Sequence, residues 1–108
     1  MIEVYIYKNK YGNVYGYELK NHADPIVCSA VSVLSLNTAN SIEAFTNEKV
    51  ICDYDENGGF FHLEVISLKD AITVDDNPAS LLINSFVLGV ESIEKEYKKE
   101  ITVKYREV

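Results

Sequence analysis

The sequence is poor in several residue types that define particular classes of protein. Only two of its 108 residues are cysteine and only two are histidine, which is too few for a disulfide-built scaffold. These four side chains also lack the paired spacing of zinc ligands, so no metal site is expected. No apolar run reaches the length of a membrane span, and the first ten residues do not resemble a secretory signal peptide. We therefore expect a cytoplasmic protein with reduced thiols and no membrane partner.

Basic residues are also scarce. Ten Lys and Arg stand against seventeen Asp and Glu, which leaves a formal net charge of −7. This sign argues against a direct nucleic-acid partner, because binding to phosphates requires a basic surface. An acidic surface attracts basic proteins or peptides, although solubility alone also explains such a charge. With 47% hydrophobic residues, the chain is long enough for one core, and we expect a single domain over residues 1–108.

The first half of the chain has two clear patterns. Residues 2–7 and 14–19 alternate apolar and polar side chains with the period of a β-strand, and the turn-forming residues 9–13 lie between them. This predicts a β-hairpin. From 26 to 45 the apolar positions recur at helical spacing, which predicts a long helix.

The second half repeats the order with one more strand. Residues 50–54 and 60–66 flank the segment Asp-Glu-Asn-Gly-Gly, which predicts a second hairpin. Asn77 followed by Pro78 is typical of a helix start, and an alternating run from 101 to 105 predicts a last strand. The order β-β-α-β-β-α-β predicts an α+β fold, a mostly antiparallel sheet with two helices packed on it.

The segment from His22 to Cys28, which leads into the first predicted helix, carries the most reactive pair of side chains. A helix N-terminus and a nearby imidazole both stabilise a thiolate, which is the nucleophilic form of cysteine. Unpaired backbone N–H groups at about Cys28 and Ser29 would also stabilise an oxyanion. An alternative remains open: Cys28 is simply a small buried residue at the start of a core helix, and six positions of separation do not prove contact with His22.

Other polar side chains have weaker patterns. Ser32 lies one helical turn after Cys28, where its hydroxyl either supports the site or bonds to a preceding helix carbonyl. Cys52 and His62 fall within predicted strands, and we interpret them as structural.

Several segments together resemble the ribosomal-processing cysteine proteases, over nearly the whole chain. The specific part is His22-Ala23, a short loop with Asp24, and then Cys28 and Ser32 in the form Cys-x-x-x-Ser. The stretches 39–43, 55–59 and 88–97 are similar to the family in the same order.

The resemblance implies a cysteine endopeptidase in which His22 is the base and Cys28 the nucleophile of a catalytic dyad. It also implies a homodimer whose substrate is a basic precursor, large-subunit ribosomal protein twenty-seven with an N-terminal extension, and it implies no cofactor. Two other functions remain open: a non-catalytic ribosome-assembly or protein-binding module with the same fold, and a cysteine-dependent enzyme for a small molecule.

This chain departs from the family pattern beside both residues of the dyad. Asn21 stands where the family usually has glycine before the histidine, and asparagine is among the residues that tolerate positive φ best. The loop between His22 and Cys28 is shorter than usual, which makes it stiffer and affects the choice of cleavage sequence. Pro25 holds the position of the family aspartate, so the role of Asp24, whether orienting or capping, stays open.

Overall fold

The computed structural model describes residues 1–107 and has the predicted order of elements. The strands and helices are β1 (Ile2–Lys8), β2 (Val14–Lys20), α1 (Pro25–Phe45), β3 (Val50–Tyr54), β4 (Phe60–Val65), α2 (Pro78–Glu96) and β5 (Ile101–Glu107). A short 3₁₀ turn, Ile66–Leu68, follows β4 and was not predicted. The fold class is confirmed: two helices and one five-stranded, mostly antiparallel sheet.

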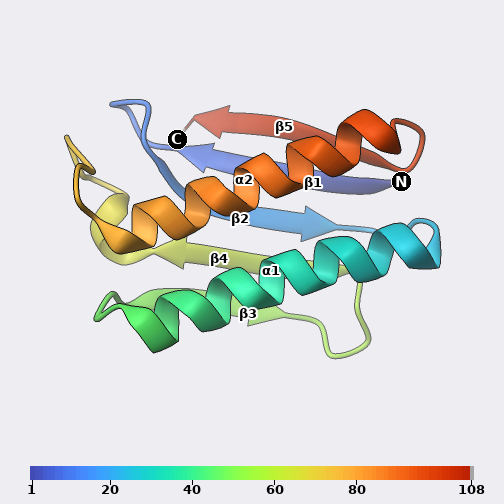
Figure 1. Cartoon of the computed structure of the whole chain (residues 1–108), viewed down its shortest axis with the longest axis horizontal. Coiled ribbons are helices and arrows are strands. Elements are labelled where there is room, and N and C mark those ends of the chain that lie inside the picture. Colours follow the sequence, from blue (N-terminus) through green and yellow to red (C-terminus); the bar gives the residue numbers. More distant parts are fainter. Residues whose placement is uncertain (108) are drawn as a thin grey trace.

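The sheet has the strand order β3-β4-β2-β1-β5. All neighbouring strands are antiparallel except β1 and β5, which run parallel with Ile2 opposite Ile101. The helices α1 and α2 each connect two strands of the same direction, β2 to β3 and β4 to β5. The β2–α1–β3 connection runs toward one edge of the sheet and the β4–α2–β5 connection toward the other, and β2 and β4 are antiparallel. Because such connections are right-handed, both helices lie on the same face of the sheet (Figure 1).

The predicted start of α2 is confirmed. Asn77 is the N-cap, and its side-chain oxygen accepts a hydrogen bond from the N–H of Ser80 at 3.1 Å. Pro78 follows at the first helical position, where its missing N–H removes no helical hydrogen bond.

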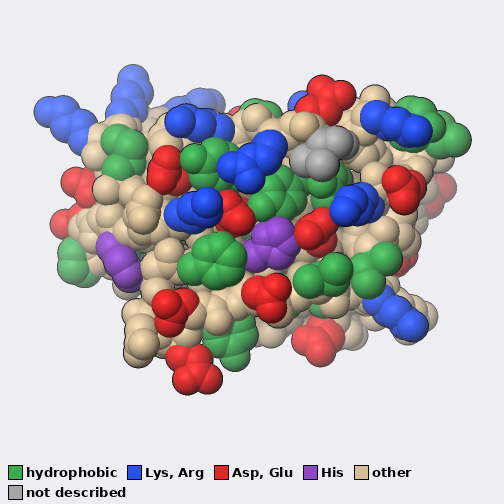
Figure 2. Space-filling model, turned by 180° about the vertical axis from the view of Figure 1, so that it is seen from behind, with side chains coloured by type: hydrophobic (Ala, Val, Ile, Leu, Met, Phe, Trp, Pro, Cys, Tyr) green, Lys and Arg blue, Asp and Glu red, His purple; other side chains and the backbone are tan. Residues whose placement is uncertain are grey.

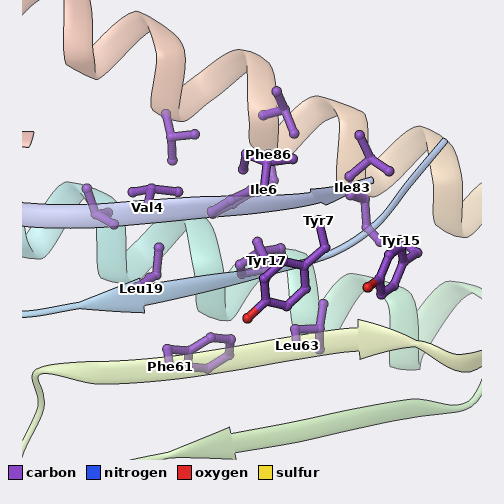
Figure 3. Close-up of a cluster of buried hydrophobic side chains, with 14 of the residues drawn as sticks. Val4, Ile6, Tyr7, Tyr15, Tyr17, Leu19, Phe61, Leu63, Ile83 and Phe86 are labelled. Carbon is purple, nitrogen blue, oxygen red and sulfur yellow. The ribbon is translucent and has the colours of Figure 1, made fainter. Parts of the chain in front are cut away.

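The core lies between the sheet and the two helices, and Tyr17 on β2 is at its centre (Figure 3). Its ring stacks on Phe86 of α2 with the centroids 3.8 Å apart, and on Phe61 of β4 with the centroids 6.0 Å apart. Its hydroxyl donates to the carbonyl oxygen of Ser35 in α1 at 2.8 Å. One side chain thus joins the middle of the sheet to both helices, and through Ser35 it fixes α1 above the sheet.

The helix α1 differs from its prediction in two ways. Phe45, expected on the buried side, is 77% exposed because it is the last helical residue and extends beyond the core. The helix is also long and apolar enough by composition to cross a membrane, with a mean hydropathy of 1.3, contrary to the expectation that no segment reaches that length. Core helices of globular proteins meet the same criterion, and here Val33 and Leu36 add apolar residues to the solvent side.

Within residues 1–107, no helix covers the other face of the sheet. Figure 2 shows this face, on which basic, acidic and hydrophobic side chains are mixed. His62 lies there, and its ring nitrogens contact the hydroxyl of Tyr7 at 3.3 Å and the carboxylate of Glu64 at 2.8 Å. Burial and the neighbouring Glu18 raise the pKa of Tyr7 well above its usual value. His62 therefore belongs to a polar network on the sheet.

Candidate active site

The N-terminus of α1 is built by a short capping motif. Asp24 is the N-cap, and its carboxylate accepts a hydrogen bond from the N–H of Ile26 at 2.9 Å. Pro25 follows at the first helical position, so the Asp-Pro pair starts α1 as the Asn-Pro pair starts α2. Of the two roles left open for Asp24, the structure supports capping.

Cys28 lies at the end of this first turn and is half-buried. Its sulfur accepts from the N–H of Ala23 at 3.2 Å, and its S–H donates to the carbonyl oxygen of the same residue at 3.3 Å. The side chain therefore folds back over the loop that leads into the helix. This contact holds the thiol at the mouth of the helix, beside the positive end of its dipole.

The two backbone N–H groups predicted as oxyanion donors, at Cys28 and Ser29, are not unpaired in the structure. The N–H of Cys28 is not free, because it donates to the carbonyl oxygen of Asp24 at 2.9 Å and closes the first helical turn. Ser29 lies one residue further into α1, where the helical pattern gives its N–H a carbonyl four residues back. With Asp24 as the N-cap and Pro25 as the first helical residue, both N–H groups are used within the helix.

His22 lies on the other side of the loop, just after β2, and its side chain is exposed. The preceding Asn21 has a φ of +71°, which confirms that asparagine adopts the turn for which the family uses glycine. The N–H of Asn21 donates to the carbonyl oxygen of Gly59 at 2.9 Å, and its side chain donates to Glu3 at 2.7 Å. These bonds attach the loop to the β3–β4 hairpin and to β1.

His22 and Cys28 line one pocket of about 410 Å³ between α1 and the β3–β4 hairpin. The wall of the pocket is largely apolar, with Leu36 from α1 and Phe60 from β4, and it carries polar groups near the thiol. Within residues 1–107 no hydrogen bond joins the sulfur to the imidazole, since the thiol is bound to Ala23 instead. The structure thus places the two predicted residues at one site in a conformation in which they are not yet bonded.

Ser32 lines the same pocket, one turn after Cys28. In the described part of the chain its hydroxyl bonds neither to a site residue nor to a preceding helix carbonyl, so neither alternative considered for it is seen. Its backbone carbonyl accepts from the hydroxyl of Ser35 at 3.1 Å.

The β3–β4 hairpin is the part of the site that sequence reasoning missed. Residues 55–59 were predicted as a turn, but nothing in their spacing from His22 indicated that they form a wall of the pocket. Asp55, Glu56, Gly58 and Gly59 all line it. The only available signal was that this segment and the His22 loop both resemble the same family.

Cys52, predicted to be structural, does not line this pocket. It lies exposed on the edge strand β3. Partial burial of its sulfur, with the carboxylates of Asp53 and Glu43 nearby, raises the pKa of this thiol. Cys52 is thus less readily ionised than an ordinary cysteine.

The chain is similar to known proteins over almost its whole length. The family model of the cysteine protease Prp matches residues 1–102. The ribosomal processing cysteine protease Prp of Staphylococcus aureus strain Mu50 is 30% identical over 112 residues, which cover 98% of this chain and 100% of that protein.

Two crystal structures of an essential ribosomal processing protease Prp from S. aureus also match, one with a covalently linked product peptide and one with a substrate peptide. The first has a TM-score of 0.84 at 30% identity, and the second a TM-score of 0.84 at 28% identity. Each match covers 98% of this chain and 100% of the other.

Proposed function

The chain belongs to the family of the cysteine protease Prp and is a cysteine protease, and we propose that it removes the N-terminal extension of a ribosomal protein precursor. The substrate we propose is large-subunit ribosomal protein twenty-seven, with Cys28 as nucleophile and His22 as base. The observation that carries the proposal is that these two residues line one pocket beside the N-terminus of α1.

The reaction follows from the chemistry of these two side chains. His22 takes the proton of the Cys28 thiol, and the thiolate sulfur attacks the scissile carbonyl carbon. The C–N bond of the peptide then breaks, and the imidazolium gives its proton to the leaving amine. Water hydrolyses the thioester that remains, which restores the thiol and releases the second product. The covalently linked product peptide in the S. aureus relative supports a covalent step of this kind.

Reaching this state requires one local change in the site. The thiol must leave Ala23, and the imidazole must come within hydrogen-bond distance of the sulfur. Catalytic hydrogen bonds often form only when substrate is bound. Substrate that fills the pocket beside Leu36 would exclude water from the same place.

The substrate proposal is supported by charge as well as by the relatives. A chain with a net charge of −7 attracts a basic precursor and repels phosphate backbones. The two free cysteines in the described chain fit a reducing compartment, and we propose the cytoplasm as the place of action.

The direct test is the intact mass of the extended precursor after incubation with the protein. We expect one discrete N-terminal loss, and none with Cys28→Ala or His22→Ala, whereas Cys52→Ala serves as the control cysteine and keeps the activity. A precursor left uncut by the folded, reduced protein would contradict the substrate assignment. Binding without cleavage would instead favour a ribosome-assembly module.

Thiol labelling tests the nucleophile without any substrate. Iodoacetamide in limiting amount near neutral pH should label Cys28 before Cys52, because partial burial and the nearby carboxylates raise the pKa of the Cys52 thiol. Peptide mass spectrometry measures both sites in one sample. Faster labelling of Cys52 would argue against an activated Cys28.

We also propose that the protein is a homodimer that uses the outer side of its helices. Large apolar residues are exposed there, with Val33 on α1 and Leu81 and Leu88 on α2. Burying them against a second copy would remove this surface from water. Light scattering after gel filtration should give a dimer that Leu88→Glu converts to a monomer, while Lys104→Glu on the opposite face of the sheet does not. A monomer at all concentrations would refute the proposal.

A further inference from the structure

The turn of the β3–β4 hairpin lies directly against the imidazole of His22. A Cβ atom added to Gly59 would lie 2.7 Å from Nε2 of the ring, and one added to Gly58 would lie 3.3 Å from Cε1. Heavy atoms at 2.7 Å overlap, so a side chain at position 59 would force the ring to move. The ring therefore occupies a notch that exists because these two residues have no side chains.

The same turn also holds the backbone next to His22. The carbonyl oxygen of Gly59 accepts the N–H of Asn21 at 2.9 Å. Within the turn, the N–H of Gly58 donates to the carbonyl of Asp55 at 2.9 Å, and the N–H of Asn57 donates to the Asp55 carboxylate at 2.9 Å. A hydrogen-bonded turn thus packs against the ring of His22 and also binds the backbone of the preceding residue, Asn21.

Backbone conformation alone does not explain this arrangement. Gly58 and Gly59 have φ of +83° and +87°, a region that favours glycine in any turn. Gly12, in the β1–β2 turn, has φ of +83° as well, yet a Cβ there would meet nothing within 4 Å. The three glycines share one backbone requirement and differ in how closely they approach the imidazole.

We propose that Gly58 and Gly59 are positioning residues, which set where the His22 ring lies beside the pocket before it turns toward Cys28. This inference rests on the proposed role of His22 as base. It adds that the turn between β3 and β4, which contains neither His22 nor Cys28, sets the position of the base. Neither glycine touches the substrate carbonyl in this role.

The three glycines provide a graded experiment, with Gly12→Ala as the matched control. All three alanine variants should lose a similar amount of thermal stability, about 4–8 °C in Tm, because each puts a side chain at positive φ. Only the hairpin variants should lose kcat/KM. We expect about 100-fold for Gly59→Ala, since displacing a catalytic group by about 1 Å costs that much, a smaller loss for Gly58→Ala, and none for Gly12→Ala.

Histidine NMR tests the same inference without any activity measurement. The chain has only two histidines, so the ring signals of His22 and His62 can be followed separately. Gly59→Ala should shift the His22 signals and leave those of His62 in place, and Gly12→Ala should shift neither. If Gly59→Ala does not fold, Gly58→Ala carries the same comparison with a milder overlap.

The outcomes separate this inference from the proposed function. Equal loss of kcat/KM in all three variants, or an unmoved His22 signal in Gly59→Ala, would overturn the positioning role. Full activity of His22→Ala would instead refute His22 as the base, while the NMR comparison would still report whether the turn holds the ring.

Discussion

Replacing Asp24 distinguishes a cap from a catalytic carboxylate. The structure gives this side chain one hydrogen bond, from the N–H of Ile26 at 2.9 Å, at the start of the helix that carries Cys28. Asp24→Ala removes this cap, which typically costs about 1 kcal/mol, or about 4–8 °C in Tm for a domain of this size. Asp24→Asn keeps a good cap and removes only the charge, so it should keep the stability of the natural protein.

The kinetic effect expected from lost capping is small. If the whole 1 kcal/mol were expressed as fraying of the first turn of α1, the population of correctly placed Cys28 would fall by about five-fold at most. A carboxylate that orients the histidine of a catalytic triad behaves differently, because its change to an amide lowers kcat by about 10⁴-fold. Asp24→Asn therefore separates the two roles by orders of magnitude.

The assay combines thermal unfolding with kcat/KM on the precursor, and Asn77→Ala is the matched control. Asn77 caps α2 through Ser80 in the same way, but α2 carries no residue of the proposed dyad. We expect Asp24→Ala and Asn77→Ala to lose similar stability and only the first to lose activity. An Asp24→Asn variant that is stable but nearly inactive would refute the capping interpretation and make the charge of Asp24 part of the chemistry.

Two further predictions concern the core. Tyr17→Phe removes the bond to the Ser35 carbonyl and should lower the free energy of unfolding by about 1 kcal/mol, measured by urea denaturation; an unchanged midpoint would argue against this link between β2 and α1. Burial raises the pKa of Tyr17 and Tyr7, so both stay protonated in the folded state above the pH at which they ionise in the unfolded chain. Stability should therefore fall as the pH rises above about 10, and a flat urea midpoint between pH 8 and 11 would contradict this.

The sequence predicted those parts of the fold that depend on neighbouring residues. The Asn77-Pro78 helix start and the alternation of the strands are local features, and the structure confirms them. The parallel pairing of β5 with β1 joins the two ends of the chain, so no local pattern determined it. Phe45 fitted the helical spacing but lies at the helix end, where spacing does not show whether the core extends far enough to cover it.

The site was predictable to a similar extent. The pattern of His22 and Cys28 before a helix indicated two residues that line the pocket, and the turn at Asn21 was expected from the resemblance, because asparagine tolerates positive φ. The use of the Cys28 N–H within the helix depends on where α1 begins. The contact of Gly59 with His22 depends on how two distant segments pack, which spacing along the chain does not encode.

The pairing of β1 with β5 also has a consequence for synthesis of the protein. Of the five strands of this sheet β1 is made first, and it is an inner strand, between β2 and β5. During translation β1 can pair with β2 early, but its other edge stays open until residues 101–107 have left the ribosome. Pairings over such long sequence separations slow folding, because the loop must close before the contact forms. Until then, the open edge of β1 can pair with a wrong strand.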